Sequence, residues 1–269
     1  MVIGTHAIFQ KDTKFKNLSL VIYDEQHRFG VGQRLKLKEK AASFPHQLLL
    51  SATPIPRTMA MTVLSGLEIS TIKSLPPNRK PIVTTSLSND RRPALIQRIK
   101  EAISKGSQVY WVCPKIEEGE SDLVSVEDLE NILKKEFKKD EYEILHGKMK
   151  DKEKGDILER FKSEQIKILL ATTVIEVGID APDANIMVIE NSERFGLSQL
   201  HQLRGRVGRG TKESFCILMH KDEMSEIAKQ RLSIIKETND GFVVAEEDLN
   251  LRGPGDILGL SQTGLPSFM

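Results

Sequence analysis

Short apolar runs rich in β-branched residues alternate with longer amphipathic stretches along this sequence. Apolar residues in the longer stretches recur at helical spacing, most clearly in residues 92–105, 126–138 and 151–162. Repeated strand-and-helix units are typical of α/β proteins with a mostly parallel sheet, so we predict that fold class. The predicted strands are residues 19–23, 47–50, 82–86, 108–112, 143–145, 167–171, 186–189 and 215–219.

A segment with three prolines, residues 75–81, interrupts this alternation. Each proline disfavours helix at the residue before it, so the segment is predicted to link two α/β units, with a boundary near Lys80. The length of 269 residues also indicates two domains, at about 150 residues per domain. The predicted domains are residues 1–80, 81–223 and 224–269, the last a pair of helices (224–238 and 242–249) with a glycine-rich tail.

Charge is unevenly distributed, although the net charge of the chain is +1. The near-neutral total excludes a simple basic arm, whereas the 12 basic and 5 acidic side chains of residues 1–80 allow a nucleic-acid enzyme with a localised basic cleft. The sequence has no apolar run of membrane-spanning length and no secretory signal at its start, so we expect a cytoplasmic protein with no membrane partner. Cys113 and Cys216 lie in apolar surroundings and are expected in the core, in neither a disulfide nor a zinc site.

Two adjacent carboxylates, Asp24 and Glu25, directly follow the first predicted strand, and Gln26 and His27 come next. The carboxyl ends of strands are where open α/β sheets bind ligands. An aspartate there can hold Mg²⁺ through water, and the next carboxylate can orient the water that attacks a nucleotide phosphate. The pattern therefore indicates nucleotide hydrolysis, although two solvated acidic residues in a turn would look the same.

Small hydroxyl residues and a cluster of arginines follow later in the chain. Ser51 and Thr53 come after the second predicted strand, where hydroxyl groups either relay hydrogen bonds from a hydrolytic site or cap a helix. The sequence QLRGRVGR at residues 202–209 contains three arginines. Arg206 and Arg209 would share a helical face if a helix continued through them, and their guanidinium groups suit phosphate oxygens. A solvated basic turn is the alternative.

Together and in this order, these segments resemble a known family. DEQH, SAT and QLRGRVGR are similar to motifs II, III and VI of superfamily 2 helicases, and TTVIEVGID at residues 172–180 resembles their motif V. The longer segments 24–34, 51–62 and 239–264 are similar to the RecG-type branched-DNA translocases. The resemblance implies a RecA-like P-loop NTPase helicase fold with parallel sheets, in which residues 1–80 are part of a first motor domain and residues 81–223 are a second motor domain.

The resemblance also implies roles for the matching residues. Asp24 would bind Mg²⁺ and Glu25 would act as general base, while Gln26 and His27 would sense bound ATP. Arg206 and Arg209 would act as arginine fingers across a cleft that closes on ATP and opens after hydrolysis. Further implied nucleotide-site residues are Ser51, Thr53, Gly178, Asp180 and Gln202, and implied nucleic-acid contacts are Thr5, His6, His146, Thr172, Thr173 and Arg252.

The implied function is that of the motor portion of an ATP-dependent DNA helicase, an ATP hydrolase acting on branched double-stranded DNA in recombination and repair, with ATP and Mg²⁺ as cofactors. The phosphate-binding loop GxxxxGK[ST] does not occur in this sequence, nor does the wedge-type DNA-binding domain of such proteins. We expect both in a preceding part of the same protein. We therefore expect this chain alone to hydrolyse ATP negligibly.

Two other interpretations remain open. An Mfd-like transcription-repair translocase shares most of these motifs, although Gln26 and the sequence Gly253-Pro254-Gly255 favour the RecG type. A noncatalytic nucleic-acid-binding module could retain the motor architecture, although the intact acidic pair and arginines argue against it. The histidines that match no motif, His46, His201 and His220, are expected to be structural or exposed to solvent.

Overall fold

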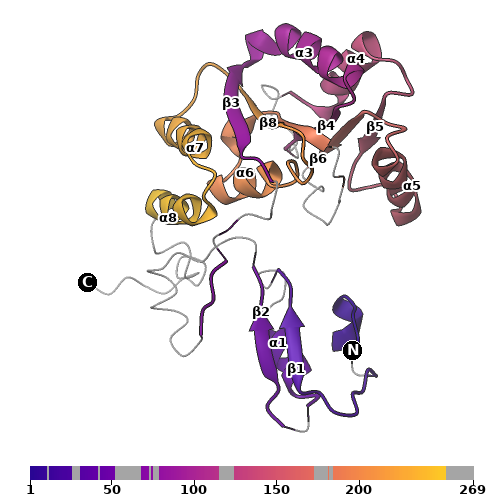
Figure 1. Cartoon of the computed structure of the whole chain (residues 1–269), viewed down its shortest axis with the longest axis vertical. Coiled ribbons are helices and arrows are strands. Elements are labelled where there is room, and N and C mark those ends of the chain that lie inside the picture. The colour runs from indigo at the N-terminus through magenta and orange to yellow at the C-terminus, as the bar shows by residue number, and fades with distance from the viewer. Residues whose placement is uncertain are drawn as a thin grey trace. The chain divides into compact units, whose positions relative to one another are not determined.

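The chain forms two compact units, Met1–Pro54 and Ile55–Met269 (Figure 1). The computed structural model describes residues 1–10, 12–25, 31–41, 43–51, 68–72, 74, 79–114, 124–172, 181 and 184–252. Most of the proline-rich segment, residues 75–78, lies outside the described residues. The predicted domain boundary near Lys80 therefore stays a prediction.

The first unit contains a small parallel sheet. Strand β1 (Leu20–Tyr23) pairs with β2 (His46–Leu49), and Tyr23 lies opposite Leu49. Because side chains alternate across a strand, Val21 and Tyr23 are buried, and they cluster with Leu37 of the helix α1 (Val31–Lys38). The short helix η1 (His6–Phe9) also packs against this cluster.

The second unit is built on a six-stranded sheet in which every neighbouring pair is parallel. The strand order is β3-β8-β7-β4-β6-β5, and the central strand β4 is buried along its whole length. All eight predicted strands are present in the two units, and the α/β prediction is confirmed. The six strands of this sheet are β3 (Ile82–Ser88), β4 (Gln108–Cys113), β5 (Tyr142–Leu145), β6 (Ile168–Thr172), β7 (Ala184–Ile189) and β8 (Ser214–His220).

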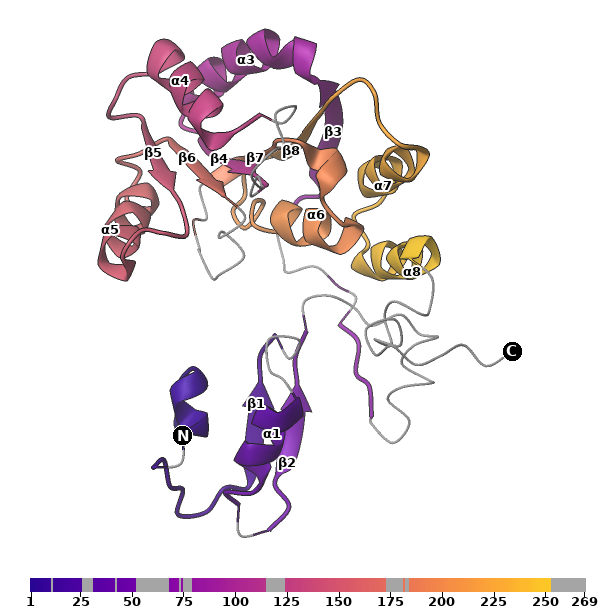
Figure 2. The same cartoon turned by 180° about the vertical axis from the view of Figure 1, so that it is seen from behind.

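Helices cover both faces of this sheet (Figures 1 and 2). Helices α3 (Arg92–Ser104) and α4 (Val126–Glu136) pack on one face against a cluster that includes Trp111. Helices α5 (Asp151–Lys162), α6 (Leu197–Arg204), α7 (Glu226–Glu237) and α8 (Gly241–Arg252) contribute to the cluster on the other face, which includes Tyr110. The one-residue offset between Tyr110 and Trp111 is the strand alternation that produces a three-layer fold. Two short helices, η3 (Asn89–Arg91) and η5 (Ser192–Arg194), complete the unit.

The described part of the chain after β8 contains helices and no strand. Helices α7 and α8 confirm the predicted helical pair, and residues 253–269 of the predicted tail lie outside the described residues. No helix in the described ranges has both the length and the apolar character needed to cross a bilayer.

Candidate functional site

The two predicted hydrolytic segments of the first unit lie side by side at one edge of its sheet. Asp24 and Glu25 directly follow β1, and Ser51 comes two residues after the end of β2. The backbone N–H of Leu50 donates to the carbonyl oxygen of Tyr23 at 2.8 Å, which holds the two strand ends together. Asp24 and Ser51 are exposed, whereas Glu25 is half-buried. The structure therefore brings these three predicted residues to the same carboxyl edge.

Glu25 has a backbone conformation that is uncommon for its residue type. Its φ is 52°, in the left-handed region. Non-glycine residues in this region are uncommon, and those held there are concentrated at functional sites. This geometry is consistent with the predicted importance of Glu25, and no sequence pattern indicated it.

The acidic pair fits Mg²⁺ bound mainly by water and phosphate. Magnesium commonly takes one or two carboxylates together with waters and substrate phosphates. The exposed Asp24 at the strand end provides one such carboxylate, and the described residues contain no group of three or more His, Cys, Asp or Glu side chains that could hold a metal ion alone.

Several predicted residues cannot be placed. Gln26, His27, Thr53, Thr173, Gly178 and Asp180 lie outside the described residues. The backbones of His6 in η1 and Arg252 at the end of α8 are described, but their side chains are not. Thr5 precedes η1, is exposed, and makes no capping hydrogen bond through its side chain.

The three arginines of residues 202–209 have different surroundings. Helix α6 ends at Arg204, so Arg206 and Arg209 do not share a helical face. Arg204 is only 2% exposed, whereas Arg206 is half-buried and Arg209 is exposed. Gln202 is half-buried on α6. The regular spacing of these arginines in the sequence therefore did not indicate that Arg204 is a buried structural residue, unlike the predicted fingers Arg206 and Arg209.

Arg204 joins α6 to the C-terminal helices. Its Nη1 donates to the carbonyl oxygens of Ile235 at 2.6 Å and Thr238 at 2.8 Å. Its Nη2 lies 2.9 Å from Nδ1 of His201. Burial, and then the charge of Arg204, lower the pKa of His201 to about 4, so the neutral imidazole accepts this hydrogen bond. His201 is structural, as predicted.

A second contact joins α6 to α8. The hydroxyl of Ser198, near the start of α6, donates to Oδ2 of Asp248 at 2.6 Å, and Asp248 is 8% exposed. Helix α6 is thus fixed at one end to α8 and at the other to the turn between α7 and α8. A displacement of α6 would be transmitted to this helical pair.

The predicted phosphate contacts lie at opposite ends of the strands of the six-stranded sheet. The side on which these parallel strands end is its carboxyl edge, and the side on which they begin is its amino edge. His146 follows the last residue of β5, and Thr172 is the last residue of the adjacent β6, so both lie at the carboxyl edge. Gly208 packs against Ile82 and Ser214, the first residues of β3 and β8. The segment with Arg206 and Arg209 therefore lies at the amino edge, and the unit presents two separate candidate binding surfaces.

Sequence reasoning missed a buried carboxylate at the end of β7. Glu190 is fully buried, and its Oε1 accepts from Trp111 Nε1 at 3.0 Å while its Oε2 accepts from Arg92 Nη2 at 2.7 Å. Burial raises the pKa of Glu190, and the charge of Arg92 opposes that effect. Glu190 thus ties β7 to β4 and to the start of α3. The partners are 79 and 98 residues away in the sequence, so no local signal could identify them.

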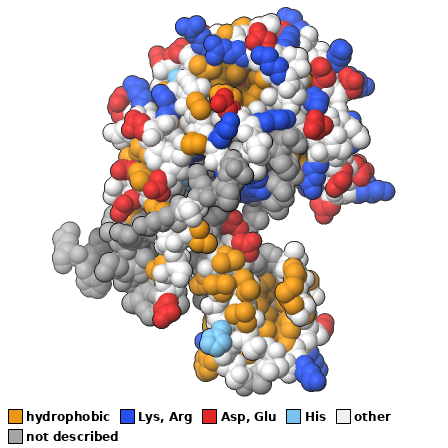
Figure 3. Space-filling view, in the orientation of Figure 1, with side chains coloured by type: hydrophobic (Ala, Val, Ile, Leu, Met, Phe, Trp, Pro, Cys, Tyr) orange, Lys and Arg blue, Asp and Glu red, His pale blue; other side chains and the backbone are white. Residues whose placement is uncertain are grey.

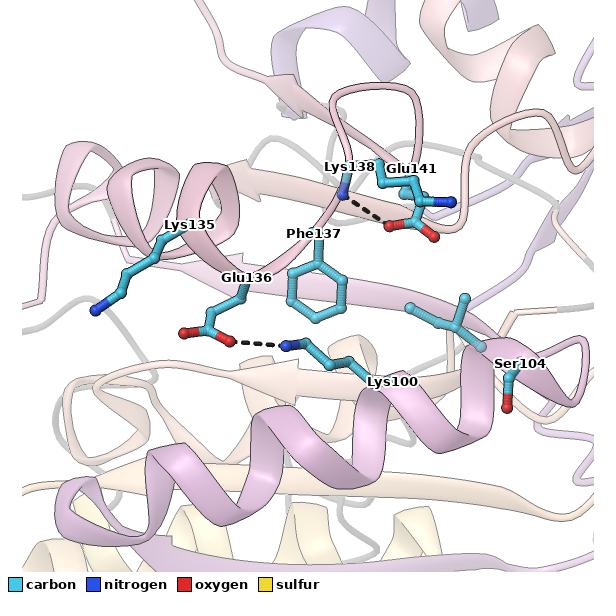
Figure 4. Close-up of a pocket in the computed structure, with 8 residues that line it drawn as sticks. Lys100, Ser104, Lys135, Glu136, Phe137, Lys138 and Glu141 are labelled. Atoms are coloured by element: carbon cyan, nitrogen blue, oxygen red, sulfur yellow. Dashed lines mark hydrogen bonds and ion pairs between the residues drawn. The ribbon is translucent and has the colours of Figure 1, made fainter.

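A more exposed ion pair joins α3 and α4, the helices that cover the face of the sheet with Trp111. Lys100 of α3 and Glu136 of α4 are 2.7 Å apart, with side chains 35% and 29% exposed. They point toward one another and help to line a hollow of about 480 Å³ (Figure 4). None of the residues that line this hollow belongs to the predicted sites.

The protein families that match this chain follow one another along it in the same order as the predicted motifs. Residues 1–62 match the DEAD/DEAH box helicase family, and residues 92–211 match the helicase conserved C-terminal domain. Residues 238–268 match the family described as ATP-dependent DNA helicase RecG, domain 3, C-terminal.

Known proteins match over the whole chain. The ATP-dependent DNA helicase RecG of Pasteurella multocida (strain Pm70) is 52% identical over 100% of this chain and 39% of its own length. The protein of the same name from Escherichia coli (strain K12) is 50% identical, with the same coverage of 100% and 39%. A solved structure of RecG bound to a three-way DNA junction has 42% identity and a TM-score of 0.76, covering 99% of this chain and 34% of that chain. The chain thus spans 39% of the length of these two curated relatives.

Proposed function

The chain belongs to the RecG-type helicases of superfamily 2, and from this premise we propose that it forms the motor portion of an ATP-dependent translocase acting on branched double-stranded DNA. The observation that carries the proposal is about 50% identity over the whole chain to proteins named ATP-dependent DNA helicase. We further propose that it works on forks and junctions in recombination and repair, in the cytoplasm. The relative bound to a three-way DNA junction supports the choice of branched DNA.

In the proposed mechanism, the first unit supplies the hydrolytic groups. Bound Mg²⁺ would neutralise charge on the ATP phosphates. Asp24 would hold the ion at the end of β1, and Glu25 would take the proton of the attacking water. Gln26 and His27 would sense the bound nucleotide. Ser51 and Thr53 would relay hydrogen bonds between the hydrolytic site and a neighbouring surface. The common strand edge of Asp24, Glu25 and Ser51 supports this assignment.

The second unit would supply Arg206 and Arg209 as arginine fingers, with Gln202, Gly178 and Asp180 beside the nucleotide. A guanidinium group stabilises the charge that develops on the transferred phosphoryl group. On the DNA side, His146, Thr172 and Thr173 would contact backbone phosphates, as would Thr5 and His6. The amino end of α5, a 12-residue helix, is suited to such a contact because the first N–H groups of a helix have no partner within the helix.

The C-terminal helices would convert nucleotide-dependent motion into movement on DNA. Helix α6 leads directly into residues 205–209, the arginine segment, which carries Arg206 and Arg209. The helix is bonded to α8 through Ser198 and Asp248 and to the turn before α8 through Arg204. Arg252, at the end of α8, would lie in the part that acts on duplex DNA. The match of residues 238–268 to a RecG-specific family supports this assignment over the Mfd-like alternative.

We propose that another part of the same protein, carrying the phosphate-binding loop and the wedge-type DNA-binding domain, completes the first motor domain. The apolar side chains on one face of the β1–β2 sheet support this proposal. Leu20, Ile22 and Leu48 are 52%, 55% and 48% exposed, and hydrophobic side chains gather on the visible face of this unit (Figure 3). An apolar sheet face of this kind is normally covered by other elements of its domain.

The test is ATP hydrolysis by the full-length product of the gene that encodes this chain. Hydrolysis would be measured with forked DNA, linear duplex DNA, duplex RNA or no nucleic acid, and the 269-residue chain alone would be the control. We expect the greatest stimulation by forked DNA and negligible turnover by the control chain. Equal ATP hydrolysis by the full-length protein with each nucleic acid and with none would contradict the translocase proposal. Hydrolysis in no arm would favour a noncatalytic module, and tight binding to RNA polymerase would favour the Mfd-like alternative.

A further inference from the structure

The arginine segment is fixed against the start of β3. Gly208 has a φ of +74°, and a Cβ atom at this position would lie 3.0 Å from Cγ1 of Ile82 and 3.5 Å from Cβ of Ser214. Ile82 and Ser214 are paired across β3 and β8. The backbone after α6 therefore passes directly over the first residues of these two strands. Arg209, the next residue, is held beside the chain that enters β3.

The residues entering β3 include a second arginine that sequence analysis did not single out. Arg79 lies three residues before Ile82 and is half-buried, whereas the adjacent Lys80 is exposed. Burial, and then the positive charge of Arg209, lower the pKa of Arg79. The guanidinium group of Arg79 nevertheless remains charged at neutral pH, because arginine is protonated in proteins. Two cations are thus close together at the amino edge of the sheet.

Guanidinium groups in such an arrangement suit a polyanion. Each presents a planar set of donors that matches phosphate oxygens, and phosphates bound among them would offset the repulsion between like charges. We propose that Arg79 acts with Arg206 and Arg209 as one phosphate-binding group, and that its ligand is the ATP phosphates. This inference rests on the function proposed above. It assigns a nucleotide contact to the residues that enter β3, at the end of the predicted linker, so that nucleotide occupancy would act directly on this segment.

The same chemistry would also suit DNA phosphates, and the position of Arg79 favours the nucleotide. Its neighbour Arg209 belongs to the segment at the amino edge, whereas the predicted DNA contacts His146 and Thr172 lie at the carboxyl edge. An experiment can separate the two sources, because ATP and DNA concentrations can be varied independently.

The test compares R79Q with K80Q in the full-length gene product, using steady-state ATP hydrolysis at saturating forked DNA. We expect R79Q to lower kcat/KM for ATP about tenfold or more, as for the loss of one charge-assisted contact, while the DNA concentration for half-maximal stimulation changes less than about twofold. K80Q should resemble the wild type. The thermal unfolding of both variants is measured alongside and should match the wild type.

Three results would overturn the inference. An R79Q enzyme with wild-type kcat/KM would remove Arg79 from the site while leaving the proposed function intact. A raised DNA requirement with unchanged kcat/KM for ATP would reassign Arg79 to DNA. A wild-type protein without ATP hydrolysis would overturn the proposed function, and this inference with it.

Discussion

Nη1 of Arg204 lies 2.6 Å from the carbonyl oxygen of Ile235, which joins the end of α6 to the last turn of α7. The last carbonyl groups of a helix have no partner within the helix, so this one depends on a donor from elsewhere. The same guanidinium group also binds Thr238, in the turn that leads to α8. A single side chain thus links the end of α6 both to α7 and to the turn before α8.

We expect Arg204→Ala to destabilise the protein without acting on a ligand. The change leaves two carbonyl oxygens without their donor, and we expect the free energy of unfolding to fall by about 2–4 kcal/mol. Arg209→Ala is the matched control, because Arg209 is exposed and its removal should cost less than about 0.5 kcal/mol. Urea unfolding followed by circular dichroism measures both. Similar losses in the two variants would contradict the distinction between them.

The buried pair of Glu190 and Arg92 gives a second contrast. Glu190→Gln leaves the guanidinium group of Arg92 without its charged partner in a buried setting, which should cost about 3–5 kcal/mol. Glu136→Gln breaks the partly exposed pair with Lys100, which solvent screens, so its cost should be much smaller. Denaturant midpoints of the two variants provide the comparison. A cost for Glu190→Gln as small as that for Glu136→Gln would show that the buried pair is not a stabilising link.

The fold was more accessible from the sequence than the site. Strand alternation and helical spacing are local signals, and they identified the eight strands of the described residues and the C-terminal helical pair. The contacts of Glu190 and Arg204 depend on elements distant in the sequence, and no local pattern encodes them. The arginine segment shows the same limit, because its spacing suggested a shared helical face for Arg206 and Arg209. The helix ends at Arg204, before both residues, and Gly208 beyond it has a positive φ.

The pair of His201 and Arg204 should make stability depend on pH. The pKa of His201 is lowered from 6.5 to about 4, so the unfolded chain binds a proton at a higher pH than the folded protein does. The stabilising contribution is therefore complete above about pH 6.5 and is lost as the pH falls toward 4, with a limit of about 3 kcal/mol. His201→Asn should remove this component. Unfolding free energies at pH 7, 5.5 and 4.5 should converge for the two proteins as the pH falls, and parallel profiles would refute the assignment.

Two glycines with positive φ should respond differently to alanine. Gly106 has a φ of +83°, and no atom lies within 4 Å of the position that a Cβ would take, so Gly106→Ala should cost only the left-handed conformation, about 1–2 kcal/mol. Gly208→Ala adds an encounter at 3.0 Å with the buried Ile82, and overpacking should raise the cost by about 1–3 kcal/mol more. Thermal unfolding of the two variants tests this difference. A smaller loss for Gly208→Ala would mean that the β3 contact adapts freely.

Arg209→Ala should separate hydrolysis from nucleotide binding. An arginine finger acts on charge that develops in the transition state, so its removal should lower kcat by about a thousandfold while nucleotide affinity changes little. The measurement is single-turnover hydrolysis by the full-length gene product, together with equilibrium binding of a non-hydrolysable ATP analogue. Arg91→Ala, at an exposed arginine of η3 outside the predicted sites, is the control and should retain activity. Because Arg209 is exposed, the variant should keep wild-type stability, so reduced turnover cannot be attributed to unfolding. Equal losses of binding and hydrolysis would instead assign Arg209 to ground-state phosphate binding, where it would act in the same way as the proposed role of Arg79.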